Sequence, residues 1–305
     1  SKLLTFALKN AKALEQFFHG RRLKMLGHKI RHHLKRNSRL GAKRNIMAHY
    51  DLGNAFYALW LDPSMTYSSA LFHHPGETLE QGQKNKYQRI LDQLTPHSSI
   101  LEIGAGWGGF CQMAAQQSHR VSGLSLSKEQ IHYCQQRFIQ NNIQESAAVF
   151  YQDYRSHRGQ YDHIVSIEMF EAVGKRYWPS YFKTLKRCLK PNGQAVVQVI
   201  TIADGLYHRY AKQSDFIQKF IFPGGFLPSI QRFRQCALKN GLKVIDQKKF
   251  GLQEGLISPR SVFETITNPD LGVFDTGVFG IGAQEPTTEQ EYNDYLRSLG
   301  LTAQV

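Results

Sequence analysis

Hydrophobic positions along the chain fall into short runs that alternate with longer amphipathic segments. The short runs predict buried strands, and the segments between them repeat apolar residues at helical spacing. This alternation predicts a parallel sheet covered by helices on both faces. The predicted elements are helix 79–94, strand 99–103, helix 109–117, strand 119–124, helix 127–141, strands 147–151 and 161–167, helix 175–189, a turn at 191–193 and strand 194–200.

A glycine-rich loop follows the first predicted strand, in the segment LEIGAGWGG at residues 101–109. Glycine lets the chain turn sharply and lets a ligand lie against the main chain. The amides at the start of the following helix face such a ligand. Gly104, Gly106 and Gly109 fit the dinucleotide pattern G-x-G-x-x-G, which is a weak signal alone. The loop therefore predicts a nucleotide-like cofactor.

The residues around the loop favour S-adenosylmethionine (SAM) over NAD. An NAD site needs a carboxylate at the end of the second strand to hold the ribose, whereas this strand ends in Ser125-Leu126-Ser127. Glu102, two residues before the loop, suits the E/D-x-G-x-G-x-G pattern of class I SAM methyltransferases. Ligands of such sheets bind at the carboxyl ends of the strands. One crevice is therefore expected to gather the loop and the polar residues Ser125, Asp153, Glu168, Glu171 and Gln198.

The net charge of +14 is concentrated near the N-terminus. Residues 1–44 hold thirteen Lys and Arg and a single acid, Glu15, so the rest of the chain is almost balanced. Apolar residues recur there at helical spacing, and we predict a basic amphipathic helical arm over residues 1–48. Such an arm binds anionic surfaces. An anionic phospholipid membrane is favoured over nucleic acid, for which no motif is present. A solvated helix packed on the domain is the other alternative.

The composition is that of a globular protein, with 41% hydrophobic residues and no apolar run close to the ~20 residues of a membrane span. The four cysteines are far apart and have no His or Cys partners at ligand spacing. They are expected to be reduced thiols of a cytoplasmic protein, and no metal site is predicted. The sequence does not determine the oligomeric state and is compatible with a homo-oligomer.

A Phe-rich segment, FIQKFIFPGGFLPS at residues 216–229, is broken by Pro-Gly-Gly. The Gly-Gly pair permits a hinge and the Phe residues offer an apolar wall, so we predict an acyl-substrate lid around residues 205–230. Plain core packing of a helix 214–222 is an equal alternative. Beyond residue 249 the pattern weakens, until a helix expected at 287–299.

Four segments resemble the cyclopropane fatty acid synthases, a family that includes the mycolic acid cyclopropane synthases. They are HYDLGNAFYALWLDPSMTYSSALF (49–72), LEIGAGWGG with GLSLSKEQ (101–109 and 123–130), QDYR with DHIVSIEMFEAVG (152–155 and 162–174) and KFIFPGGFLPS (219–229). The resemblance implies methyl transfer from SAM to the double bond of an acyl chain in a phospholipid. In the family, loss of a proton to a bound bicarbonate then closes the cyclopropane.

The resemblance also implies which residues bind SAM. Family positions along the cofactor are matched from its methionine end to its adenine. They are Tyr67 and Ser68 at the methionine end, Glu102, Gly104 and Gly106 at the loop, Ser125 and Gln130 at the ribose, and Asp153 and Tyr154 at the adenine.

The chain departs from the family where bicarbonate is held. Ser69 stands where the family has Cys, Ala172 where a His follows the Glu, and Gln198 where a strand carries His. Only Glu171 remains of these residues. The family also uses a Tyr near the C-terminus to hold bicarbonate, and this Tyr has no clear counterpart here. These departures argue against a bicarbonate site. Glu171, with Glu168, is the predicted base, and Ser69 and Gln198 complete the predicted catalytic group.

We therefore predict a Rossmann-like α/β class I SAM methyltransferase domain at residues 49–305, with a mostly parallel central sheet. Its expected function is that of a cyclopropane-fatty-acyl-phospholipid synthase, on the inner face of the cytoplasmic membrane as a peripheral protein. One alternative is a diverged member that makes a methyl-branched or methylene product, or performs another acyl-chain step as in furan fatty acid pathways. A lipid-binding protein that kept the fold without methyl transfer, and a nucleic-acid methyltransferase, are the others.

Overall fold

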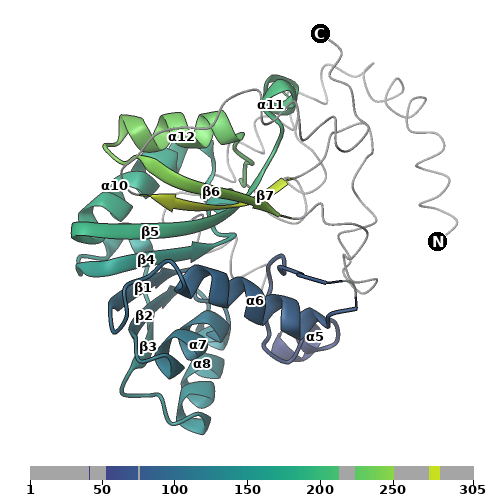
Figure 1. The fold of residues 1–305 in the computed structure, drawn as a ribbon, viewed down its shortest axis with the longest axis vertical. Helices are drawn as coiled ribbons and strands as arrows, with labels where there is room; N and C mark the ends of the chain where they lie inside the picture. The colour runs from purple at the N-terminus through teal and green to yellow at the C-terminus, as the bar shows by residue number, and fades with distance from the viewer. Residues whose placement is uncertain (1–40, 42–52, 75, 213–223, 251–274, 282–305) are drawn as a thin grey trace, which may run out of the picture.

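The structure is a computed structural model that describes residues 41, 53–74, 76–212, 224–250 and 275–281. One seven-stranded sheet crosses this part, in the order β3-β2-β1-β4-β5-β7-β6 (Figure 1). The first five of these strands are parallel, and β7 is antiparallel to both of its neighbours. The predicted α/β fold with a mostly parallel sheet is thus confirmed. The strands are β1 (Ser99–Ile103), β2 (Arg120–Ser125), β3 (Ala147–Tyr151), β4 (Tyr161–Ile167), β5 (Leu189–Thr201), β6 (Val244–Phe250) and β7 (Asp275–Ile281).

Helices follow the strands at several points, and polar side chains begin three of them. The hydroxyls of Thr78, Ser127 and Ser229 accept main-chain N–H groups at the starts of α6, α8 and α12, where those groups lack helical partners. The helices are α5 (Asn54–Ala58), α6 (Leu79–Leu91), α7 (Gly109–Gln116), α8 (Lys128–Gln140), α9 (Phe170–Val173), α10 (Trp178–Cys188), α11 (Asp204–Tyr210) and α12 (Ile230–Lys239), with the 3-10 turns η1 (Tyr154–Ser156) and η2 (Lys175–Tyr177).

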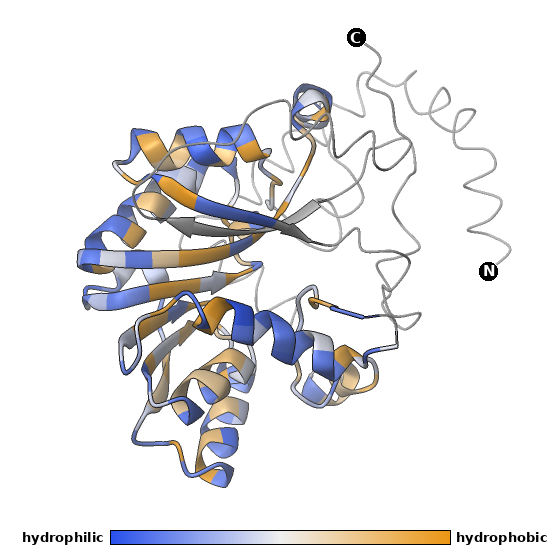
Figure 2. Cartoon of the chain, viewed as in Figure 1, coloured by the Kyte–Doolittle hydropathy of each residue, from blue (hydrophilic) through white to orange (hydrophobic). Residues whose placement is uncertain are grey.

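Each face of the sheet carries its own hydrophobic core, because successive strand residues point to opposite faces. Ile100 packs with residues of α6, α7 and α8, whereas Leu101 and Ile103 pack with residues of α9 to α12. Hydrophobic positions accordingly run through the middle of the strands, while α6 is largely hydrophilic along its length (Figure 2). This double burial explains the near-continuous apolar strands of the sequence.

The predicted start of strand 194–200 is wrong. Strand β5 begins at Leu189, so it includes the Pro-Asn-Gly segment expected to be a turn before it. The pairing of β4 with β5 shifts register there, and Asn192 takes a positive φ of 64°. The Pro-Asn-Gly segment, which is typical of a turn in the sequence, therefore forms a bulge within the strand. The expected helices at 214–222 and 287–299, and nearly all of the arm, lie outside the described residues.

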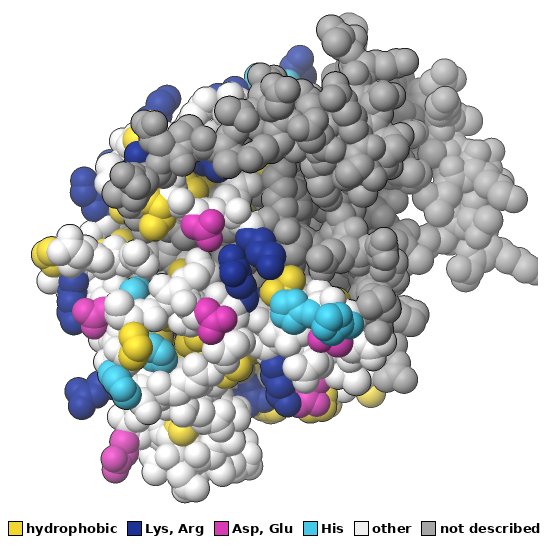
Figure 3. All heavy atoms as spheres, viewed as in Figure 1, with side chains coloured by type: hydrophobic (Ala, Val, Ile, Leu, Met, Phe, Trp, Pro, Cys, Tyr) yellow, Lys and Arg dark blue, Asp and Glu magenta, His cyan; other side chains and the backbone are white. Residues whose placement is uncertain are grey.

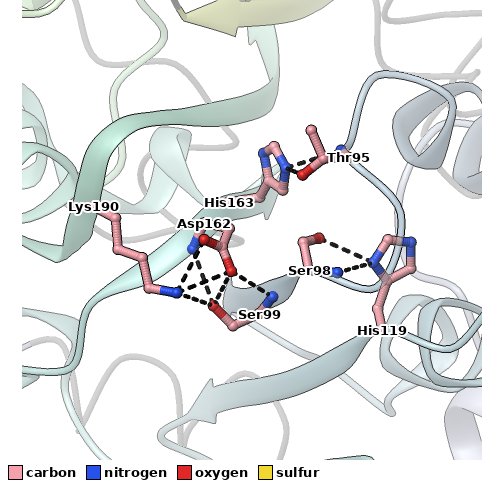
Figure 4. A network of polar contacts seen from close by, with 7 residues as sticks. All are labelled: Thr95, Ser98, Ser99, His119, Asp162, His163 and Lys190. Carbon is pink, nitrogen blue, oxygen red and sulfur yellow. Dashed lines mark hydrogen bonds and ion pairs between the residues drawn. The ribbon is translucent and has the colours of Figure 1, made fainter.

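A polar network joins the amino ends of the strands, opposite the glycine loop (Figure 4). The Asp162 carboxylate accepts the main-chain N–H of Ser99 at 2.9 Å and its hydroxyl at 2.6 Å, and pairs with Lys190 at 3.0 Å. These hydrogen bonds, led by the Ser99 hydroxyl, hold the pKa of Asp162 well below its usual range. The network fixes the starts of β1 and β4 relative to each other.

Replacing Asp162 by Ala is expected to lower the free energy of unfolding by about 1–2 kcal/mol at pH 7, because charge-assisted bonds to Ser99 are lost. The Lys190→Ala control removes the half-exposed ion pair and a long 3.3 Å hydrogen bond to the Ser99 hydroxyl, and should cost less than about 0.5 kcal/mol. Since the folded pKa is depressed, the wild-type advantage is complete above about pH 4 and shrinks as pH falls further. Urea unfolding at several pH values measures both; equal losses for the two variants would contradict the assignment.

Candidate functional site

The glycine loop leaves β1 and is closed against β2. The main-chain N–H groups of Gly104 and Ala105 both donate to the Leu124 carbonyl at 3.0 Å. Gly104, Gly106 and Gly108 have positive φ values of 89°, 53° and 79°. A Cβ on Gly104 would lie 3.0 Å from Met169, and one on Gly108 would lie 2.9 Å from the Cys134 sulfur, whereas one on Gly106 would meet nothing within 4 Å. The loop is packed on two sides and bare at Gly106.

Glu102 is buried beneath this loop. The Cys111 thiol of α7 donates to its carboxylate at 2.8 Å. Burial raises the pKa of Glu102 to about 8, although the hydrogen bond from Cys111 and the charge of Lys86 oppose the rise. The sequence singled out Glu102; it did not reveal its hydrogen bond with Cys111 or the influence of the Lys86 charge on its pKa.

The end of β2 presents a small polar pair. The Ser125 hydroxyl donates to the Gln130 side-chain oxygen at 2.9 Å and accepts the main-chain N–H of Ser127. Both Ser125 and Gln130 are buried, and the Gln130 Nε2 has no hydrogen-bond partner in the described part of the chain. A buried amide donor without a partner is costly, so this position suits a ligand that accepts a hydrogen bond.

Four side chains bind the Ser68–Ser69 segment, which precedes α6 in the chain. From α6, Lys86 donates to the Ser68 hydroxyl at 2.6 Å and Gln83 donates to the Ser68 carbonyl at 2.8 Å. From the sheet, Glu168 accepts the Ser69 N–H at 3.0 Å, and the Gln198 amide lies 3.4 Å from the Ser69 carbonyl. The preceding residue, Tyr67, packs its ring 5.3 Å from that of Trp60.

Glu168 and Gln198 also bind each other. The Gln198 amide donates to the Glu168 carboxylate at 2.8 Å, and the Glu168 N–H donates to the Gln198 carbonyl at 2.9 Å. Glu168 has a positive φ of 46°, an uncommon conformation for a residue other than glycine. Three of the four predicted catalytic residues, Ser69, Glu168 and Gln198, are therefore in direct contact.

Glu171, the fourth predicted catalytic residue, lies in α9. Its carboxyl group is held by Ile200 of β5, two residues after Gln198. One carboxylate oxygen accepts the Ile200 N–H, and the other, Oε2, is buried without a partner in the described residues. Burial, and then the negative charge of Glu168, raise the pKa of Glu171 to about 8. An ionised Glu171 would be a strong base shielded from water.

Asp153 and Tyr154 lie beyond β3 and bind within their own turn. Asp153 forms an ion pair with Arg155, with 2.5 Å between the nearest N and O atoms, and begins η1. The Tyr154 ring packs 5.8 Å from that of Tyr181, and burial raises its pKa above the usual range. None of the hydrogen bonds in the described part joins either residue to the glycine loop.

Sequence reasoning missed Gln83 and Lys86. Both lie on α6, whose many polar residues resemble a solvent-facing helix, yet they are 1% exposed. The only signal was their spacing of three residues, which places them on one helix face. No cluster of three or more His, Cys, Asp or Glu side chains suited to a metal occurs among the described residues.

The sequence model of the mycolic acid cyclopropane synthetase family matches residues 37–254. The chain belongs to this family. Membership confirms the resemblance seen in the sequence. The matched range includes the Ser68–Ser69 segment, the glycine loop and the two buried glutamates, Glu102 and Glu171.

Relatives with described activities support the assignment. A tuberculostearic acid methyltransferase of Mycobacterium tuberculosis is 39% identical over 220 residues, which are 69% of this chain and 52% of that protein. The cyclopropane-fatty-acyl-phospholipid synthase of Escherichia coli K12 is 34% identical over 227 residues, which are 70% of this chain and 57% of that protein. The chain spans about half the length of these relatives.

Solved structures share the fold. A mycolic acid cyclopropane synthase crystallised with S-adenosylhomocysteine (SAH) and CTAB superposes with a TM-score of 0.67 at 28% identity, over 78% of this chain and 97% of that one. A putative sarcosine dimethylglycine methyltransferase from Galdieria sulphuraria, at 16% identity and a TM-score of 0.60, shows the same fold. The fold is that of the class I SAM methyltransferases.

Proposed function

We propose that the protein is a SAM-dependent C-methyltransferase that transfers a methyl or methylene group to the double bond of unsaturated acyl chains in membrane phospholipids. The contact of Ser69, Glu168 and Gln198 beside the glycine loop, in a member of this family, carries the proposal. The relatives named for fatty acid methyl transfer and cyclopropane synthesis support it.

The loop suits SAM, the donor of the methyl group. Gly106 leaves the main chain bare, and Gln130 offers a buried amide with no protein acceptor in the described residues. A solved family member holds SAH, the demethylated form of that cofactor. Tyr67, Ser68, Glu102, Ser125, Asp153 and Tyr154 remain proposed cofactor contacts.

Glu171 is the proposed base for the proton that the alkylated acyl chain must lose. The oxygen that has no partner among the described residues, Oε2, is the proposed proton acceptor, and the Ile200 N–H holds the other oxygen in place. An apolar wall adjoins it, because the Phe226 N–H donates to the Glu171 carbonyl at 2.8 Å and the Phe226 ring packs against Trp178, Tyr207 and Tyr210. This wall supports the proposed acyl-chain lid around residues 205–230.

A methyl-branched or methylene product is the second candidate. Gln198 stands where the resemblance implies a His, and its amide is engaged by Glu168 rather than left for a bicarbonate ion. Several relatives are fatty acid methyltransferases by name, including one of Pseudomonas putida.

The proposed site of action is the inner face of the cytoplasmic membrane. The basic excess of residues 1–44 supports attraction to anionic lipid. On the described face, Lys and Arg side chains are interspersed with Asp, Glu and His (Figure 3). Among the described residues, no helix is both long and apolar enough to cross a bilayer.

Expression in a bacterial host that lacks its own cyclopropane synthase tests the function. Phospholipid acyl chains of the host are expected to gain one CH2 unit, and fragmentation of the derivatised chains distinguishes a ring from a methyl branch or a methylene group. Purified protein that binds SAH but leaves every acyl chain unchanged would favour a lipid-binding protein. Protein that binds neither SAM nor SAH would contradict methyl transfer altogether.

The pH dependence of turnover is expected to report Glu171. At saturating SAM, where cofactor affinity no longer limits the rate, kcat/KM for phospholipid vesicles rises with pH up to about 8 if Glu171 must be ionised. Because the Glu168 charge contributes to the raised pKa, Glu168→Gln should move this limb to lower pH by up to about one unit. Glu145→Gln, at an exposed position, is the control. A limb that stays in place in Glu168→Gln would assign it to another group such as Glu102, for which Glu168 is not among the causes of the raised pKa.

A further inference from the structure

Lys86 is a buried amine for which the proposed reaction has no use. Its side chain is among the largest that are fully buried, and the amine donates to the Ser68 hydroxyl at 2.6 Å and the Gln83 side-chain oxygen at 2.5 Å. Both acceptors are neutral, and none of the ion pairs within the described residues includes Lys86. A buried ammonium in such surroundings is poorly compensated.

Charged groups from three other elements face this amine. Glu168 after β4, Asp62 in the loop after α5 and Glu102 in β1 all favour its protonated form, and the Tyr87 ring lies 5.0 Å from it. Burial outweighs the three carboxyls and lowers the pKa of Lys86 to about 7. The amine can therefore gain or lose a proton at neutral pH at little cost.

Its hydrogen bond leads to the cofactor end of the site. Ser68 is a proposed cofactor contact, at a position that the resemblance implies lies at the methionine end of SAM. We infer that Lys86 is a positioning residue that holds Ser68 and gives up its proton when a positively charged cofactor binds. The inference rests on the proposed function, because it needs SAM to lie beside Ser68.

Charge repulsion determines the direction in which the pKa of Lys86 changes when SAM binds. A sulfonium near the amine disfavours the ammonium, so SAM binding lowers the pKa of Lys86 and releases protons. By linkage, SAM affinity rises with pH around neutrality. SAH lacks the methyl group and its positive charge, so it exerts no such repulsion and releases fewer protons.

Calorimetric titration at pH 7, in two buffers of different ionisation enthalpy, counts the protons released. Lys86 is expected to contribute up to about 0.5 proton to the excess that the wild type releases with SAM over SAH, since a group with a pKa near 7 is half protonated there. The matched control is Lys84→Met, an exposed lysine on the same helix, which should keep the full difference.

Two variants test the assignment. Lys86→Met and Lys86→Arg should each lose up to about 0.5 proton of the SAM–SAH difference, leaving what the carboxyls with raised pKa, Glu102 and Glu171, release. Lys86→Arg, which stays charged, should also bind SAM about tenfold more weakly relative to SAH. Folding of each variant is checked by thermal unfolding, and either one decides the question if the other does not fold. A difference as large as that of the wild type in the folded variant, or no difference in the wild type, overturns the inference. Failure of the wild type to bind either ligand instead overturns the proposed function.

Discussion

Replacing Glu171 by Gln is expected to abolish product formation while cofactor binding is retained. The amide has the shape of the carboxyl group, so its oxygen can still accept the Ile200 N–H. Its nitrogen then occupies the place of the unpartnered Oε2 and cannot take a proton. Loss of a general base costs about 10²–10⁴-fold in rate, so kcat should fall by at least about 100-fold. Turnover on phospholipid vesicles and SAH titration measure the two effects.

The outcomes of this substitution separate a catalytic role from a structural one. Glu145→Gln, which changes an exposed carboxylate outside the site, should retain full activity. If Glu171→Gln keeps its activity, Glu171 is not the base, and a bound bicarbonate regains its place as the candidate. If the variant loses SAH binding and stability together, the carboxyl serves the fold through Ile200 rather than the reaction.

The strands of the parallel half could be predicted because both of their faces are buried. Strand β1 has the predicted bounds Ser99–Ile103, and the hydrophobic runs of β2 to β4 lie within a residue of expectation. The last two strands were not predicted. Strand β7 pairs with β5 and β6 from a distant part of the chain, and its sequence, DTGVFGI, has two glycines and little apolar alternation. Long-range pairing of this kind leaves no local pattern.

For a related reason, the sequence predicted which residues gather at the candidate site but not which of them are in contact. Glu168 and Gln198 could be placed at one edge because Glu168 follows β4 and Gln198 lies near the carboxyl end of the neighbouring parallel strand β5. Their direct contact with the Ser69 main chain, 99 residues from Glu168, required the structure. The burial of Gln83 and Lys86 could not be predicted, because the polarity of a residue does not tell which helix face covers the sheet. Hydrogen-bond partners are tertiary properties.

Placing a methyl group on the bare side of the glycine loop should block the cofactor with little harm to the fold. A Cβ on Gly106 meets no atom within 4 Å, so Gly106→Ala creates no internal clash. Its φ of 53° is left-handed, which costs an L-residue about 1–2 kcal/mol. If the cofactor lies against Gly106, the added methyl group overlaps it and SAH affinity falls by about 100-fold, the effect of a few kcal/mol of steric conflict.

A matched glycine separates backbone strain from occupation of the cofactor site. Gly76 also has a positive φ, 95°, and open space around its Cβ, but it lies in the loop before α6. Gly76→Ala should also lower the thermal midpoint, because its positive φ disfavours an L-residue, and should leave the SAH dissociation constant unchanged. Unaltered SAH binding by folded Gly106→Ala would move the cofactor away from this side of the loop. Because the φ of 95° at Gly76 lies further from the left-handed helical region than the 53° at Gly106, strain alone predicts no greater effect at Gly106, so a loss of affinity confined to Gly106→Ala is assigned to the space that its methyl group fills.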